Sequence, residues 1–269
     1  MPKALLTGAA GGIGQATAQL LWRKGFHLVL TDRDEDLLHR TYPELPAGST
    51  LYVLDVTNLQ AWQQAVQYFA EVDILIQLAG VMRVGTFIQQ PIEAWHLQLQ
   101  VNLVGLAYGA WTFGRLFAER GAGHLIHLSS LAGVTAIPGI VGYTATKFGV
   151  RGLSLGLDAE LRPLGVPVTV IGPGPVRTPL ILNELPKPES VYTLAAGGLL
   201  ESEDVAQAIW RAIRKRPREI LLPFHKAMAA RLISLWPALQ SYAASLFESG
   251  ARRRREKYLQ SLPNSDTLS

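Results

Sequence analysis

Short apolar segments alternate with longer helical patterns through most of the chain, and this alternation strongly limits the fold. The segments read as continuous runs of Leu, Val and Ile, which is typical of strands buried on both faces. Expected strands cover residues 3–7, 27–31, 50–54, 73–77, 124–129, 168–171 and 219–222, and expected helices cover 13–24, 58–70, 93–119, 143–162 and 202–215. We therefore predict a doubly wound α/β domain, with a mainly parallel sheet of about seven strands and helices on both faces.

The charge of the chain divides it into two parts. Residues 1–204 carry 13 basic and 17 acidic side chains, whereas residues 205–269 carry 12 basic and 4 acidic ones. The formal net charge of +4 thus arises from the C-terminal quarter, and it gives no general argument for a nucleic-acid partner. Because the strand pattern stops at the same place, we predict a catalytic domain at 1–222 and a basic helical extension at 223–269.

Several classes of protein are excluded by composition. A 48% hydrophobic content is ample for a large core and excludes a disordered chain. The absence of cysteine excludes disulfides, thiolate zinc sites and a cysteine nucleophile. His124 and His127 lie three apart on an expected strand and point to opposite faces, so we expect no metal site. We find no secretion signal and no membrane-spanning run, and expect a cytoplasmic location.

A glycine-rich loop, Thr7-Gly8-Ala9-Ala10-Gly11-Gly12-Ile13-Gly14, joins the first strand to the first helix. Glycines at such a turn let the backbone approach a pyrophosphate, and the helix N-terminus supplies oriented N–H groups for it. The candidate dinucleotide-binding residues here are Gly8, Gly12, Ile13 and Gly14. The alternative is an ordinary glycine-rich turn.

Asp32 ends the second expected strand, about 20 positions after the loop. A carboxylate there can accept hydrogen bonds from the adenosine ribose and repels a 2′-phosphate, which favours NAD over NADP. The neighbouring Arg33 keeps NADP open, because a guanidinium can bind a phosphate. The structural alternative for Asp32 is capping of a helix at 34–38.

Tyr143 and Lys147 begin a long expected helix at i,i+4 spacing, which places a phenol and an ammonium on one helical face. A nearby positive charge lowers the pKa of a phenol, so the pair can exchange a proton with a carbonyl or alcohol oxygen. Ser130 ends an expected strand, where ligands bind in open α/β sheets, and its hydroxyl can orient that oxygen. The alternative is that the Ser129–Ser130 pair only caps a turn, a role that suits Ser129.

Over residues 3 to about 222, the chain resembles single-domain members of the short-chain dehydrogenase/reductase family. Five landmarks carry the resemblance. They are the loop at 7–14, Asp55-Val56-Thr57, Ala79-Gly80, Ser130 with Tyr143 and Lys147, and the 173–178 segment Pro-Gly-Pro-Val-Arg-Thr. The resemblance implies a Rossmann-type fold and an NAD(P)-dependent oxidoreductase acting on an alcohol or carbonyl group.

The resemblance also implies roles for individual residues. Tyr143 is the general acid/base, Lys147 holds the nicotinamide ribose and lowers the tyrosine pKa, and Ser130 polarises the substrate oxygen. Asn102 matches a helix asparagine that holds a proton-relay water. Implied cofactor contacts are Asp55 and Val56 at the adenine, Val176 and Thr178 at the carboxamide, and Ala79, Gly80, Pro173 and Gly174.

One position departs from the family pattern. The family usually has Asn-Asn-Ala-Gly after the fourth strand, and this chain has Gln77-Leu78-Ala79-Gly80. Gln77 can replace one of the lost hydrogen bonds and Leu78 cannot, so local order or cofactor affinity is expected to differ. The catalytic set is complete, and we interpret the chain as an active enzyme.

The segments after Thr178 each allow two interpretations. In the family, the stretch near 179–201 is a lid over the substrate, and its apolar residues indicate an apolar substrate; a core-packed loop is equally consistent. The extension combines apolar residues at helical spacing with the basic run Arg252–Arg255. The favoured interpretation is a helix that closes the pocket or contacts another subunit, followed by a solvated charged end. The less favoured alternative is contact with an anionic membrane surface.

We therefore predict hydride transfer between NAD, or NADP, and an alcohol or carbonyl group of a hydrophobic substrate. The resemblance implies a homodimer or homotetramer formed through the helices near 93–119 and 143–162. Two alternatives remain, a sugar-nucleotide epimerase or dehydratase and a non-catalytic NAD-sensing scaffold protein.

Overall fold

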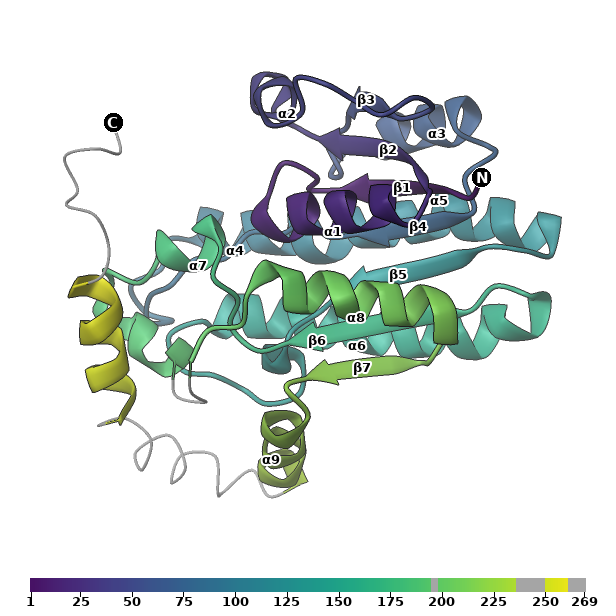
Figure 1. The fold of residues 1–269 in the computed structure, drawn as a ribbon. Coiled ribbons are helices and arrows are strands. Elements are labelled where there is room, and N and C mark those ends of the chain that lie inside the picture. The colour runs from purple at the N-terminus through teal and green to yellow at the C-terminus, as the bar shows by residue number, and fades with distance from the viewer. Residues whose placement is uncertain (195–197, 236–249, 261–269) are drawn as a thin grey trace.

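A seven-stranded parallel sheet forms the centre of the molecule (Figure 1). The computed structural model describes residues 1–194, 198–235 and 250–260. The strands are β1 Lys3–Thr7, β2 His27–Asp32, β3 Thr50–Val53, β4 Ile74–Gln77, β5 His124–Leu128, β6 Val168–Pro173 and β7 Glu219–Leu222. Their order across the sheet is β3-β2-β1-β4-β5-β6-β7, which confirms the predicted doubly wound α/β class.

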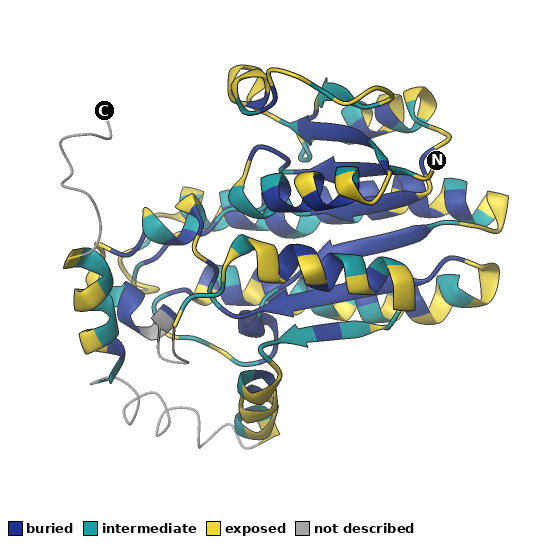
Figure 2. Cartoon of the chain, in the orientation of Figure 1, coloured by how far each residue is buried: buried dark blue, intermediate teal, exposed yellow. Residues whose placement is uncertain are grey.

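Helices cover both faces of the sheet. They are α1 Gly12–Arg23, α2 Glu35–Thr41, α3 Leu59–Tyr68, α4 Ile92–Leu99, α5 Gly105–Arg120, α6 Val141–Leu161, α7 Pro179–Leu182, α8 Ser202–Lys215 and α9 Phe224–Leu235. Three short 3₁₀ segments cover Leu131–Gly133, Arg162–Leu164 and Pro188–Leu194. In Figure 2 the buried strands lie between helices whose outer surfaces are exposed.

Alternation along the strands builds two separate cores. Leu6 of β1 and Ile76 of β4 pack with residues of α1 and α8 on one face. Their neighbours Leu5 and Leu75 point the opposite way, into a core with Phe113 of α5 and the α3 residue Trp62. Both faces of the central strands are therefore buried, as the continuous apolar runs predict.

The parallel register brings the carboxyl ends of the strands to one edge of the sheet. Thr7 of β1 lies beside Gln77 of β4, which in turn lies beside His127 of β5. The chain winds from β1 toward β3 in one direction and from β4 toward β7 in the other. Such a change of direction leaves a crevice beyond the carboxyl ends, where ligands bind in open α/β sheets.

Two helical predictions need correction. The single helix expected at 93–119 is interrupted by a π-helical segment, Gln100–Val104, between α4 and α5. Helix α2 was expected only in the alternative for Asp32, as a helix at 34–38. Its N-cap is Asp34, whose Oδ1 accepts a hydrogen bond from the Leu37 N–H at 2.8 Å, and not Asp32.

The C-terminal extension is described in two pieces. Helix α9 follows β7, and residues 250–260 form a further helix beside the segment after α7 (Figure 1). The rest of the predicted extension, 236–249 and 261–269, lies outside the described residues. No helix in the described ranges is long and apolar enough to cross a membrane.

Candidate active site

A cavity of about 610 Å³ lies along the carboxyl ends of the strands. Of the predicted catalytic residues, Ser130, Tyr143 and Lys147 line it and Asn102 does not. All other predicted cofactor residues line the same cavity, namely Gly8, Gly12, Ile13, Gly14, Asp32, Arg33, Asp55, Val56, Ala79, Gly80, Pro173, Gly174, Val176 and Thr178. Predicted site residues up to 170 positions apart in the sequence thus line one cavity.

Close backbone packing shapes the glycine loop at one end of the cavity. Gly8 has a φ of +65°, and a Cβ there would lie 2.8 Å from Ala79. A Cβ on Gly14 would collide with the carbonyl oxygens of Gly8 and Ala9. Helix α1 starts here without a side-chain cap and without a carboxylate in its first turn. Its N-terminal amides therefore face the cavity with no competing anion nearby in that turn.

Backbone amides hold the Asp32 carboxylate in place. Its Oδ1 accepts from the Arg33 N–H at 2.8 Å, and its Oδ2 accepts from the Ala10 N–H at 3.3 Å. Because Asp34 caps α2, the helix-capping alternative for Asp32 is wrong. Asp32 instead joins the end of β2 to the glycine loop.

The unusual sequence at the end of β4 is accommodated by Thr7. Its Oγ1 lies 3.1 Å from the Leu78 N–H and 3.2 Å from the Ala79 N–H, so one hydroxyl accepts from both amides. Gln77 Nε2 donates to the Leu106 carbonyl at 3.0 Å, while Gln77 Oε1 has no partner in the described ranges. Gln77 thus provides one side-chain bond, and Leu78 is positioned through its backbone.

Ser130 lies between two backbone groups. Its Oγ donates to the Pro173 carbonyl at 3.3 Å and accepts from the Ala132 N–H at 3.1 Å, which caps the Leu131–Gly133 turn. The expectation that Ser129 caps the turn is wrong, because the Ser129 hydroxyl donates to the Lys147 carbonyl at 2.9 Å. Both serines line the cavity, and backbone groups hold each hydroxyl at the end of β5.

Tyr143 and Lys147 share the first turns of α6, on the side facing the cavity. Lys147 Nζ lies 5.4 Å from the centre of the Tyr143 ring and donates to the Leu128 carbonyl at 2.9 Å. Burial raises the pKa of Tyr143 to about 12, an effect that a hydrogen bond with Ser130 opposes. Burial also lowers the pKa of Lys147 to about 8. The expected lowering of the tyrosine pKa is thus outweighed by burial, which favours the neutral phenol.

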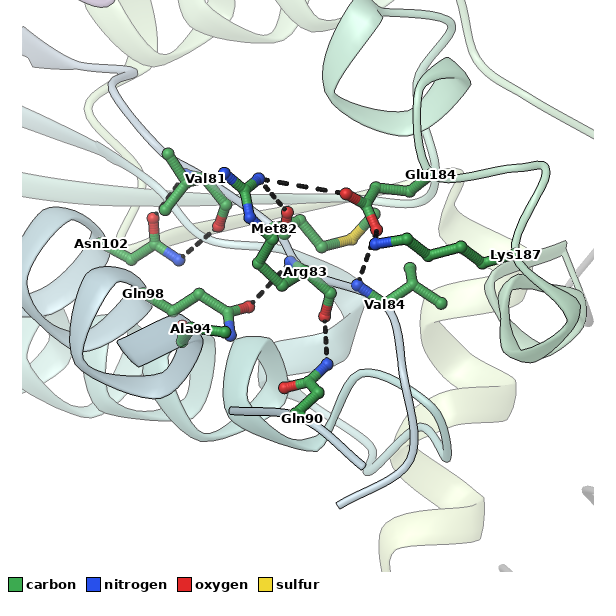
Figure 3. A network of polar contacts seen from close by, with 10 residues as sticks. All are labelled: Val81, Met82, Arg83, Val84, Gln90, Ala94, Gln98, Asn102, Glu184 and Lys187. Atoms are coloured by element: carbon green, nitrogen blue, oxygen red, sulfur yellow. Dashed lines mark hydrogen bonds and ion pairs between the residues drawn. The ribbon is translucent and has the colours of Figure 1, made fainter. Parts of the chain in front are cut away.

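Asn102 lies in the π-helical segment and binds a neighbouring loop (Figure 3). Its Oδ1 accepts from the Val81 N–H at 2.7 Å, and its Nδ2 donates to the Val81 carbonyl at 2.8 Å and to Thr146 Oγ1 at 3.1 Å. These bonds connect the loop after β4 to α6. Asn102 therefore does not line the cavity but fixes the loop that forms part of its wall.

The same loop is attached to the segment after α7. Glu184 accepts from the Val84 N–H at 2.8 Å and pairs with Lys187 at 2.7 Å, and Arg83 lies 3.9 Å away (Figure 3). Leu180, Ile181 and Thr193 of this segment line the cavity. We call the described residues 179–194 and 198–201 the lid, after the segment near 179–201 in the sequence prediction; Leu185 and Val191 within it are buried. The core-packed and pocket-forming interpretations thus both apply to it.

The helix at 250–260 also contacts the lid, through hydrogen bonds mainly to its backbone. Arg255 Nε lies 2.9 Å from the Leu185 carbonyl and 3.2 Å from Ser190 Oγ, and Arg255 Nη2 lies 2.6 Å from the Pro186 carbonyl. Tyr258 Oη accepts from the Leu199 N–H at 3.2 Å. Part of the arginine run, predicted as a solvated end, is therefore used to hold the lid.

Sequence reasoning did not predict the contacts of Glu184 and Arg255. Their partners lie far away along the chain, and Glu184 is 100 positions from Val84. The pocket-closing helix considered for the extension agrees with α9, five residues of which line the cavity.

Comparisons with known proteins agree with this architecture. A family model described as short chain dehydrogenase matches residues 2–188. An uncharacterized oxidoreductase of Staphylococcus aureus is 33% identical over 215 residues, which cover 78% of this chain and 90% of that protein. A 3-alpha-(or 20-beta)-hydroxysteroid dehydrogenase of Mycobacterium bovis is 31% identical over 210 residues, covering 77% and 80%.

Two solved structures show the same fold. A short-chain dehydrogenase from Streptomyces avermitilis has a TM-score of 0.76 at 24% identity, covering 90% of this chain and 95% of that one. One from Burkholderia cenocepacia, in complex with NADP, has a TM-score of 0.78 at 21% identity, covering 90% and 97%. With the family match over most of its length, the chain belongs to the short chain dehydrogenase family of oxidoreductases.

Proposed function

We propose that the chain is an NAD(P)-dependent oxidoreductase that interconverts an alcohol and a carbonyl group on a mainly apolar substrate. The observation that carries the proposal is the single cavity shared by the glycine loop and by Ser130, Tyr143 and Lys147. A dinucleotide and a small substrate can therefore meet beside one acid/base side chain.

The residues at the glycine-loop end fit a dinucleotide. Backbone at Gly8 and Gly14 packs too closely to admit a Cβ, and the uncapped start of α1 opens into the cavity. Such an N-terminus binds a pyrophosphate through its amides and its dipole. Asp55 and Val56 would flank the adenine, while Pro173, Gly174, Val176 and Thr178 would lie along the nicotinamide half.

Asp32 favours NAD, since its carboxylate can accept from ribose hydroxyls and repels a 2′-phosphate. Arg33 lines the cavity beside it and keeps NADP binding open. We therefore expect a lower KM for NAD than for NADP. Replacement of Asp32 by alanine should reduce or reverse that preference, and tighter binding of NADP by the unaltered chain would contradict the assignment.

The acid/base step is assigned to Tyr143. Bound nicotinamide supplies or accepts the hydride. The Tyr143 phenol, kept neutral by burial, donates its Oη proton to the carbonyl oxygen in reduction and accepts one in oxidation. The Lys147 ammonium stabilises the phenolate that remains, and Ser130 Oγ hydrogen-bonds the substrate oxygen. Behind the wall, Asn102 would hold the water through which Lys147 exchanges protons with solvent.

An apolar substrate is supported by the cavity wall and by a relative. Leu131, Ile137, Leu180, Ile181 and Ile233 line the cavity. Pockets with such walls bind apolar ligands. The mycobacterial relative is named for hydroxysteroids, which are apolar secondary alcohols.

Tyr143→Phe is the direct test. It should lower kcat/KM by about a hundred- to ten-thousand-fold on a panel of apolar alcohols and ketones, because a general acid/base contributes about that much. Cofactor affinity should change little. Tyr68→Phe on the exposed end of α3 is the matched control. Unchanged turnover in Tyr143→Phe would remove the assignment, and cofactor binding without any turnover would favour an NAD-sensing scaffold.

We also propose a homo-oligomer formed through α5 and α6. Trp111 of α5 is 50% exposed and Phe148 of α6 is 41% exposed, so each helix presents a large apolar side chain at the surface. A second copy would cover them. Light scattering after size-exclusion chromatography should give a multiple of 29.3 kDa, and Trp111→Glu should shift it toward the monomer.

A further inference from the structure

The lid and α9 form the cavity wall farthest from the predicted adenine contacts. Asp32 ends β2 and Asp55 follows β3, which is the last strand at one edge of the sheet. Helix α9 follows β7, the last strand at the opposite edge. The cavity therefore extends across the sheet from two carboxylates to the residues of α9 that line it, His225, Lys226, Ala229, Ala230 and Ile233.

Carboxylates are confined to one end of this cavity. Asp32 and Asp55 are the carboxylates among its described lining residues, and both lie at the adenine end, where Arg33 also lines the wall. The far wall is mostly apolar and includes one lysine, Lys226, with His225 beside it. A substrate that lies along the apolar wall therefore meets a cation at the α9 end of the cavity.

Lys226 has donors left for a ligand. Its Nζ donates to the Gly198 carbonyl at 3.3 Å, and within the described part of the chain no carboxylate pairs with it. By contrast, the Arg231 of the same helix pairs with Glu219. An ammonium has three N–H donors, so two remain. Burial and the nearby Arg254 both lower the pKa of Lys226, because desolvation and a neighbouring positive charge each disfavour the ammonium form.

Thr193 provides a second, independent observation. This lid residue lines the cavity and is only 8% exposed, yet its Oγ1 has no hydrogen-bond partner among the described residues. Leaving a buried hydroxyl unpaired is unfavourable, and native proteins rarely do so. The Oγ1 atom itself is enclosed, so a ligand oxygen in the cavity would satisfy it after the Thr193 side chain turns toward the cavity.

We propose that Lys226 and Thr193 form a distal anion subsite, and that the substrate is an apolar alcohol or ketone carrying a carboxylate or similar anionic oxygen group at the end remote from the reacting carbon. This inference rests on the proposed function, since it describes the substrate of the same cavity. Lys226 selects the charge, Thr193 donates to an anionic oxygen, and the apolar wall holds the body of the substrate between this subsite and the reacting carbon.

The test compares two probes of equal length, a ten-carbon methyl ketone and the same chain with a carboxylate in place of its terminal methyl group. Binding is measured calorimetrically in the Tyr143→Phe variant with cofactor present, so that no turnover is needed. The carboxylate probe should bind about tenfold tighter, because a charge-assisted hydrogen bond is stronger than a neutral one. The preference should weaken as salt is raised.

Lys226→Met should abolish the preference while leaving the affinity for the neutral ketone unchanged, since the apolar stem is retained. Lys226→Arg should keep it, and Thr193→Val should reduce it about threefold. Lys257→Met, which removes an exposed cation of the 250–260 helix outside the cavity, is the matched control. Cofactor affinity should stay the same in all four variants.

Equal binding of the two probes, no measurable binding of the carboxylate probe at millimolar concentration, or an equal loss in Lys257→Met would each overturn the subsite. A changed cofactor affinity in Lys226→Met would assign the lysine to the cofactor instead. If the preference holds but the unaltered enzyme turns over neither probe, the subsite stands and the proposed function is what requires revision.

Discussion

The two ends of the cavity are held by different kinds of contact. At the nucleotide end, Gly8 and Gly14 pack backbone against backbone, and the surrounding strands are buried on both faces. At the lid end, a few long side chains hold the segment, chiefly Glu184 on one side and Arg255 on the other. We infer that the first end is rigid before any ligand binds, whereas the second can open by releasing a few hydrogen bonds.

The largest effect is expected at the nucleotide end. In Gly14→Ala the new Cβ collides with the carbonyls of Gly8 and Ala9, so the loop must move. Cofactor binding should fall below detection by calorimetry, and the melting temperature should drop. Gly152→Ala on α6, where nothing lies within 4 Å, is the control and should be neutral or slightly stabilising. Normal cofactor affinity in Gly14→Ala would show that this end is less rigid than we infer.

The sheet that carries both ends of the cavity should lose stability in acid. Burial lowers the pKa of His124 and of His127 to about 3. Between pH 6.5 and 3 the unfolded chain therefore binds more protons than the folded one, and the free energy of unfolding falls as the pH falls. The loss between pH 7 and 4 should be roughly 3 kcal/mol for each histidine.

Urea unfolding at several pH values measures this loss. His127→Gln should flatten the pH dependence by about half, whereas His39→Gln, an exposed control on α2, should leave it unchanged. Cofactor binding and lid-dependent substrate binding should disappear together in the acid transition. If the substrate KM rose at a higher pH than cofactor binding was lost, the sheet would not be the element that fails first.

A moderate effect is expected from Arg255→Ala. Three lid acceptors lose their donor, so the lid should open more often, with KM for substrate rising about tenfold while kcat and cofactor affinity change little. The neighbouring Arg253→Ala is the control, since that side chain is exposed. Equal KM values in the two variants would show that the 250–260 helix does not secure the lid.

The smallest effect is expected from Glu184→Gln. An amide oxygen can still accept from the Val84 N–H, and the lost ion pairs involve half-exposed cations, which contribute little. KM should rise less than threefold. Glu184→Ala should raise it about tenfold, because the buried Val84 amide loses its acceptor. Similar values for both variants would mean that charge, and not the acceptor, holds this side of the lid.

Local patterns predicted the fold and much of the cavity. Each strand is a short apolar run, so residues adjacent in the sequence are enough to predict it. Tyr143 and Lys147 lie four positions apart on one helix, so their spacing alone predicts that they share a face. All predicted cofactor residues line the cavity because parallel strands bring their carboxyl ends together. Their individual roles stay predictions until the variants above are measured.

Contacts between distant residues were not predictable. Arg255 bonds the lid carbonyl of Leu185 across 70 positions, and a backbone carbonyl leaves no mark in the sequence. The turn cap was assigned to Ser129 and belongs to Ser130, because either hydroxyl can cap a turn and only the folded backbone decides which one does. Burial of Tyr143 likewise depends on the surrounding structure, so its raised pKa could not be inferred from Lys147 alone.

The π-helical segment at Gln100–Val104 has a consequence for the whole 92–120 tract. A wider turn holds more residues than an α-turn, so α4 and α5 are out of rotational phase, by about 100° per extra residue. This phase step lets Gln98 reach the Arg83 N–H while Gly109 faces Trp62, whose ring leaves no space for a Cβ. Deleting one residue from the segment would make the helix more regular but the protein less stable, because a residue bulkier than Gly109 would then turn toward Trp62.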